Sequence, residues 1–111
     1  MINRRIVECV DDTLDRNVSA LYKSQPLAQD WARIAKMIEE MGEAISELIL
    51  YTGQNPRKDT EPEAYNRMLK ELADAAMTPI YAIQHFTKDV TETERILAEA
   101  QEKHHDRLCP A

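Results

Sequence analysis

Residues 27–48, with the sequence LAQDWARIAKMIEEMGEAISEL, carry the clearest periodicity in the chain. Apolar side chains recur there at spacings of 4, 3, 4, 3, 4 and 3 residues. This pattern is typical of the seam of a helix that packs lengthwise in a bundle. The seam residues are Leu27, Trp31, Ile34, Ile38, Met41, Ile45 and Leu48. We expect the seam, including Trp31, to lie in the core, and Gly53 to cap the end of the helix.

Further helices are predicted on both sides of this stretch. Apolar residues with a period of four, from Ile2 to Leu21, predict an amphipathic helix that ends before Pro26. Residues 52–60 contain glycine, asparagine, proline and charged residues without periodicity, so we expect a loop there.

Two capping boxes predict where the later helices start. Thr60-Glu61-Pro62-Glu63 is predicted to open a third helix. Pro79 should kink that helix, and because proline has no N–H group, it should free the backbone carbonyl of Ala75. Thr91-Glu92-Thr93-Glu94 is predicted to open a fourth helix, which ends by Pro110.

The composition favours an all-α fold. The 111 residues suit one domain, and the chain has 43% hydrophobic residues, 5% aromatic residues and only two glycines. Two glycines are too few for the turns of a β-sandwich or for a glycine-rich phosphate loop. We therefore predict a four-helix bundle with two long central antiparallel helices. Its core is thin for a lone monomer, so we expect oligomerisation to complete it.

Charge and cysteine content limit the partners and the compartment. The 14 Lys and Arg against 20 Asp and Glu give a net charge of -6, which argues against nucleic-acid binding. The first residues form no apolar signal segment and no apolar run reaches the length of a membrane span, so we expect a soluble, cytoplasmic protein without membrane contact. In that compartment Cys9 and Cys109 are expected to be reduced thiols.

Carboxylates recur on the flanks of two predicted seams. Glu40 and Glu43 lie on either side of one seam residue, and Glu71 and Asp74 repeat the arrangement in the next helix. If the two helices pack antiparallel, these four carboxylates converge on one point. Rows of glutamate at this spacing usually mark a solvated helix face. Two pairs in the same phase, with Gly42 inside the first, favour a metal site instead, because a helical glycine suggests that something approaches the backbone.

A cluster of acids needs cations to neutralise it. Ligands that are all carboxylate oxygens, with no cysteine or histidine, favour Mg²⁺ or Mn²⁺ over Zn²⁺. A di-iron carboxylate bundle is excluded because it needs two Glu-x-x-His pairs, and this chain has one, at Glu102 and His105.

The acid pattern Glu39-Glu40-x-x-Glu43, followed by Glu71-x-x-Asp74, resembles the signature of the MazG-like nucleoside triphosphate pyrophosphohydrolases, an all-α family. Residues 52–58 (TGQNPRK) also resemble the inter-helix loop of a small single-domain subgroup. The resemblance covers about residues 27–108 of the single predicted domain 1–111, and leaves 1–25 as an N-terminal helical extension.

The resemblance implies hydrolysis of a nucleoside triphosphate between the α and β phosphates, which releases a monophosphate and pyrophosphate. It also implies a homodimer or homotetramer. In the site, Mg²⁺ would be held by Glu40, Glu43, Glu71 and Asp74, with Glu39 as a base for the attacking water or a group behind the ligands. Glu47 is a weaker candidate for a second metal.

The triphosphate would need basic side chains as well. Candidates for phosphate binding are Lys36, Lys70, Arg57 and Lys58, for which ordinary surface charge is an equal alternative. Tyr81 and His85 are candidates for a base pocket or for ordinary core, and Trp31 could stack on a base, although its place in the seam favours the core. The alternative function is a catalytically idle helical module that mediates dimerisation or partner binding.

Overall fold

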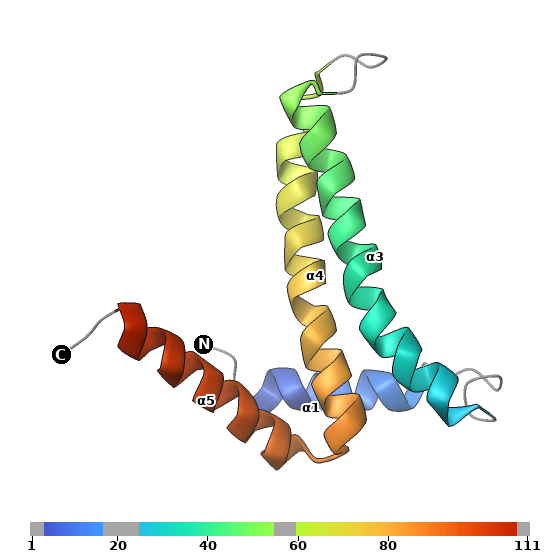
Figure 1. Cartoon of the computed structure of the whole chain (residues 1–111), viewed down its shortest axis with the longest axis vertical. Coiled ribbons are helices and arrows are strands. Elements are labelled where there is room, and N and C mark those ends of the chain that lie inside the picture. The colour runs from blue at the N-terminus through green and yellow to red at the C-terminus, as the bar shows by residue number, and fades with distance from the viewer. Residues whose placement is uncertain (1–3, 17–24, 55–59, 109–111) are drawn as a thin grey trace. The chain divides into compact units, whose positions relative to one another are not determined.

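The computed structural model describes residues 4–16, 25–54 and 60–108, and every regular element in that part of the chain is an α-helix (Figure 1). The predicted all-α fold class is therefore confirmed. The chain divides into two compact units, one made of Met1–Pro26 with Ile80–Ala111 and the other of Leu27–Pro79. The helices are α1 (Arg4–Arg16), α3 (Pro26–Thr52), α4 (Ala64–Thr87) and α5 (Val90–Leu108).

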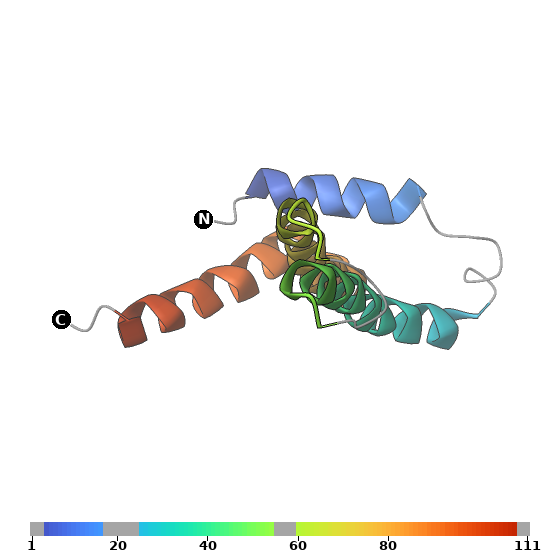
Figure 2. The same ribbon diagram turned by 90° about the horizontal axis from the view of Figure 1, so that it is seen from above.

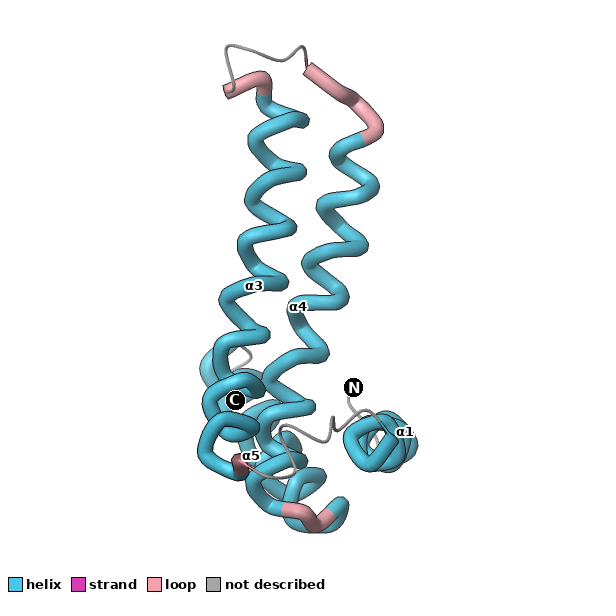
Figure 3. The backbone as a smooth tube through the Cα atoms, turned by 90° about the vertical axis from the view of Figure 1, so that its right-hand side faces the viewer, coloured by secondary structure: helices cyan, strands magenta, loops and turns pink. Residues whose placement is uncertain are grey.

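The unit Leu27–Pro79 is a helical hairpin. In it α3 and the first part of α4 run side by side in opposite directions, as Figure 3 shows along the helices and Figure 2 shows from their loop end. Residues late in α3 accordingly contact residues early in α4. The rings of Tyr51 and Tyr65 have centroids 5.3 Å apart, and Arg67 Nε lies 2.9 Å from Glu47 Oε2. Within this unit, α3 and the first part of α4 are therefore antiparallel.

Gly53 ends α3 as predicted. It adopts a φ of 69°, in the left-handed region, and the N–H of Gln54 bonds to the carbonyl of Ile49 at 3.3 Å. This is the hydrogen bond of a Schellman motif. The carbonyl of Ile49 thus finds a donor beyond the end of the helix.

The start of α4 differs from the prediction. The helix begins at Ala64, not within the capping-box sequence 60–63. Pro62 has no N–H group, and the segment forms an i to i+3 turn in which the N–H of Ala64 bonds to the carbonyl of Glu61 at 3.0 Å. The tighter turn delays the helix.

Pro79 lies inside α4, which continues through it to Thr87. The carbonyl that proline leaves without its usual donor belongs to Ala75, as predicted. The buried hydroxyl of Thr78 donates to that carbonyl at 2.7 Å. This local bond lets a helix accommodate an internal proline, and the boundary between the two units follows Pro79 directly.

The other unit contains α1, the end of α4, and α5. Its core includes Val7, Val10 and Leu14 from one face of α1, together with Ile80 and Ala82. The predicted N-terminal helix is confirmed over Arg4–Arg16; the rest of it, from residue 17 to Pro26, lies largely outside the described residues.

Polar contacts also join the helices of this unit. Arg4 Nη1 lies 3.1 Å from Glu94 Oε2 and links α1 to α5. Gln84, almost fully buried, donates through Nε2 to Asp11 Oδ1 at 2.9 Å.

The cap of α5 also differs from the prediction. Asp89, rather than Thr91, is the N-cap: its Oδ1 accepts the N–H of Thr91 at 2.9 Å and that of Glu92 at 3.3 Å. The aspartate side chain accepts hydrogen bonds from two amides that have no partner within the helix, and its oxygens interact favourably with the positive end of the helix dipole. The helix consequently begins at Val90.

The seam of α3 is exposed, contrary to the prediction that it is core. Leu27, Trp31 and Ile38 are 76%, 75% and 75% exposed, and the other seam residues are exposed as well. The predicted core position of Trp31 is therefore wrong within the single chain. The periodicity correctly marks an apolar face, but α4 does not cover it.

Two observations bear on the remaining predictions. Across residues 4–16, 25–54 and 60–108, no helix has the length and apolarity that a bilayer crossing requires. Cys9 is a free, exposed thiol, whereas Cys109 and Pro110 lie outside the described residues.

Candidate metal centre

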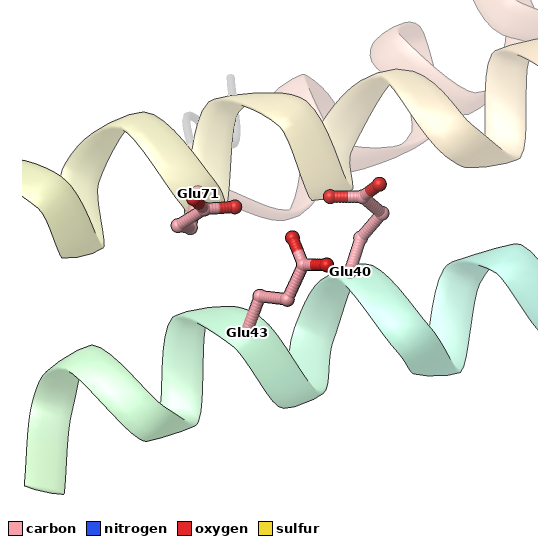
Figure 4. A group of neighbouring side chains, drawn as sticks. All are labelled: Glu40, Glu43 and Glu71. Carbon is pink, nitrogen blue, oxygen red and sulfur yellow. The ribbon is translucent and has the colours of Figure 1, made fainter.

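Three of the predicted ligands come together between the two helices of the hairpin. Glu40 and Glu43 project from one face of α3, because residues three apart are neighbours on a helix. Glu71 reaches them from α4 (Figure 4). Each residue offers a carboxylate oxygen, and these oxygens all lie within 4.8 Å of one another. We call these three residues the carboxylate group.

The group is electrostatically strained by its own negative charges. The pKa of Glu43 is raised above its usual value because its carboxyl shares a hydrogen bond with Glu71 and because the charge of Glu40 lies nearby. A proton or a cation at this position would reduce the repulsion between the carboxylates.

Lys36 supplies one positive charge at the edge of the group. Its Nζ lies 3.1 Å from Glu40 Oε1 and 3.2 Å from Glu39 Oε1. The pKa of Lys36 is raised, first by its hydrogen bond to Glu40 and then by the one to Glu39. Glu39 is thus paired with this lysine on the exposed side of α3, next to the carboxylate group rather than in it.

Asp74 is not brought into the group. It is exposed on α4, three residues after Glu71. Its carboxylate is not among the oxygens that lie within 4.8 Å of one another.

Glu47 is paired with Arg67, a contact that was not predicted. Arg67 Nε lies 2.9 Å from Glu47 Oε2, and Arg67 Nη2 lies 2.7 Å from Glu61 Oε2. The signal was available in the register: Glu47 follows Glu43 by four residues, and Arg67 precedes Glu71 by four. Where two antiparallel helices bring Glu43 and Glu71 together, residues one turn away on each helix, here Glu47 and Arg67, are expected to be neighbours as well.

The other candidates for binding the phosphates or the base have no described contact with the carboxylate group. Arg57 and Lys58 lie outside the described residues. Lys70 is exposed on α4, next to Glu71 in the sequence. Tyr81 and His85 belong to the other unit of the chain.

Gly42 does not have the role that was expected. A Cβ atom built at this position meets nothing within 4 Å, so among the described residues none outside α3 itself packs against this glycine. The inference that a close approach requires this glycine is wrong for the single chain.

The chemistry of the donors suits a hard divalent cation. The group offers only carboxylate oxygens, from two helices and at mutual distances that one ion can bridge with modest side-chain movement. Such a ligand set matches Mg²⁺ or Mn²⁺.

No protein-family model matches this chain, and no match was found among curated proteins or among solved structures.

Proposed function

We propose that this protein is a Mg²⁺-dependent nucleoside triphosphate pyrophosphohydrolase that releases a nucleoside monophosphate and pyrophosphate, with Mn²⁺ as a substitute metal. One observation carries the proposal: Glu40, Glu43 and Glu71, selected from the sequence by their phase, have carboxylate oxygens within 4.8 Å of one another. The resemblance to the MazG-like signature supplies the reaction.

The proposal assigns a role to each candidate residue. Glu40, Glu43 and Glu71 hold the metal, and Asp74 is assigned as a fourth ligand from the facing turn of α4. A divalent cation bound there polarises phosphoryl oxygens and neutralises the charge of the substrate. Glu39, beside the group, is assigned to accept a proton from the attacking water. Phosphate binding is assigned to Lys36, Lys70, Arg57 and Lys58.

The exposed seam of α3 supports an oligomer, which we propose to be a homodimer or a homotetramer. A row of large apolar side chains from Leu27 to Leu48 is costly to leave in water. A second hairpin of the same kind would cover it and complete a four-helix bundle. We also propose that the protein is cytoplasmic.

The activity is tested by measuring pyrophosphate release from a panel of normal, deoxy and damaged nucleoside triphosphates, with Mg²⁺ and with EDTA. We expect release from at least one nucleotide, abolished by EDTA and by Glu71→Gln. The matched control is Glu61→Gln, which removes a carboxylate from the same helical hairpin but outside the carboxylate group. Release that persists in EDTA, or in Glu71→Gln, would refute the metal assignment.

The exposed seam also favours a second candidate function, a catalytically idle module for dimerisation or partner binding. Such a module needs the apolar face and not the metal. Thermal unfolding with and without Mg²⁺ or Mn²⁺ separates the two: a bundle that shows no stabilisation by either ion and no pyrophosphate release fits only the idle module.

A further inference from the structure

The carboxylate group already has a cation from its own chain. Lys36 lies one helical turn before Glu40, and its ammonium is 3.1 Å from Glu40 Oε1. The side chain of Glu40 is only 14% exposed, whereas that of Lys36 is 48% exposed. The Lys36 ammonium is therefore paired with a Glu40 carboxylate that is largely shielded from water.

The second ammonium contact strengthens this placement. Nζ also lies 3.2 Å from Glu39 Oε1, so the lysine is held by two carboxylates on its own helix. The basic residue on the next turn of the hairpin, Arg67, is occupied by Glu47 and Glu61. Among these described ion pairs, Lys36 is the cation that an incoming metal ion would meet at Glu40.

We propose that Lys36 is the resident counter-cation of the carboxylate group, which a divalent cation must displace from Glu40 and which is thereby released toward the phosphates of the substrate. This inference rests on the proposed function and adds a mode of regulation to the same site. An ammonium and a divalent cation repel each other on a shared carboxylate. Lysine has a flexible four-carbon stem and three donors, so it can leave Glu40 and bind a phosphate oxygen nearby.

The exchange couples metal and phosphate binding. The metal ion competes with Lys36 for Glu40, so it binds more weakly than the three carboxylates alone would allow. Once displaced, the lysine favours an anion beside the metal. By linkage, the anion strengthens metal binding by the same factor as the metal strengthens anion binding.

The test titrates Mn²⁺ alone into the full chain, without nucleotide, and follows free Mn²⁺ by electron paramagnetic resonance. In Lys36→Met, which keeps the stem and removes the charge, we expect Mn²⁺ to bind at least about fivefold more tightly than in the wild type. Lys36→Arg keeps a positive charge and should bind Mn²⁺ like the wild type. Lys103→Met removes an exposed lysine charge from α5, in the other unit, and should change Mn²⁺ affinity by less than about twofold.

A second measurement uses the Mn²⁺ complex of inorganic tripolyphosphate, in excess Mn²⁺. Lys36→Met should bind this complex several-fold more weakly than the wild type, although it binds the metal alone more tightly. This opposite change separates the exchange from a merely structural role of Lys36.

The outcomes divide as follows. Unchanged or weaker Mn²⁺ binding in Lys36→Met, with normal binding in the wild type, overturns the inference and leaves the proposed metal site standing. Tighter Mn²⁺ binding with unchanged tripolyphosphate binding overturns the release toward phosphate. If neither the wild type nor Lys36→Met binds Mn²⁺, the proposed metal site and this inference both fail.

Discussion

Glu43 is the residue through which the carboxylate group should make the stability of the protein depend on pH. Its pKa is raised from 4.5 by the hydrogen bond to Glu71 and the charge of Glu40. A group with a raised pKa in the folded state contributes stability that is fully present below its unfolded value and is lost as pH rises through the folded value. In EDTA, we therefore expect the free energy of unfolding to fall as pH rises above 4.5 toward neutral.

Glu43→Gln checks this prediction. Glutamine keeps the neutral amide at every pH, so urea unfolding in EDTA should lose that pH-dependent decline. Mg²⁺ should stabilise the wild type most near neutral pH, where no proton competes for the carboxylates. If wild type and Glu43→Gln show the same pH dependence, the raised pKa of Glu43 does not contribute.

The two glycines differ in what they require of their surroundings. Gly42 is in mid-helix with open space around a built Cβ, so Gly42→Ala should stabilise the protein by about 0.5–1 kcal/mol. Gly53 has a φ of 69° and a built Cβ 2.6 Å from Thr60 Oγ1, so Gly53→Ala should destabilise it by at least about 1 kcal/mol. Urea unfolding at matched protein concentration measures both. A destabilising Gly42→Ala would show that a second copy or a ligand approaches this turn of α3.

At the scale of the helices, the internal proline of α4 depends on Thr78. The buried hydroxyl donates at 2.7 Å to the Ala75 carbonyl that Pro79 leaves without its backbone donor. Thr78→Val keeps the shape and removes that donor, so it should cost about 1–3 kcal/mol in chemical unfolding. Thr52→Val removes a similar bond at the exposed end of α3, to Leu48, and should cost less than about 0.5 kcal/mol. Equal costs for the two variants would contradict a special role for Thr78.

The ends of the helices were predicted with uneven success, for local reasons. Gly53 was identified correctly because few residues other than glycine adopt a positive φ without strain. The starts of α4 and α5 were displaced to Ala64 and Val90 because a capping box describes only one possible set of bonds. At the start of α5, Asp89 accepts two backbone amides with a single carboxylate and replaces the predicted cap Thr91. At the start of α4, the i to i+3 turn around Pro62 replaces the predicted cap Thr60.

At the scale of the molecule, the exposed seam of α3 is the feature with the largest predicted effect. Ile38 lies in it and is 75% exposed. If the seam is covered by a second copy, Ile38→Lys should weaken self-association at least about 100-fold while the chain remains helical. Light scattering and sedimentation over a range of concentrations measure the change.

Leu108→Lys is the matched control for that prediction. Leu108 is 80% exposed at the end of α5, outside the seam, so the same substitution should leave the mass in solution unchanged. A wild-type protein that is a monomer at micromolar concentration would refute the proposed oligomer.

By itself, the sequence determined the helices, the apolar face of each and the phase of the acids, because a 3.6-residue period sets which side chains share a face. That was enough to select Glu40, Glu43 and Glu71. It could not determine which face is covered, because periodicity marks an apolar surface without naming its partner. Only the tertiary structure decided that α4 contacts the acidic flank of α3 and leaves Trp31 and its seam in water. It also decided the register that pairs Glu47 with Arg67 across the two helices, since such a contact depends on where the two side chains end in space.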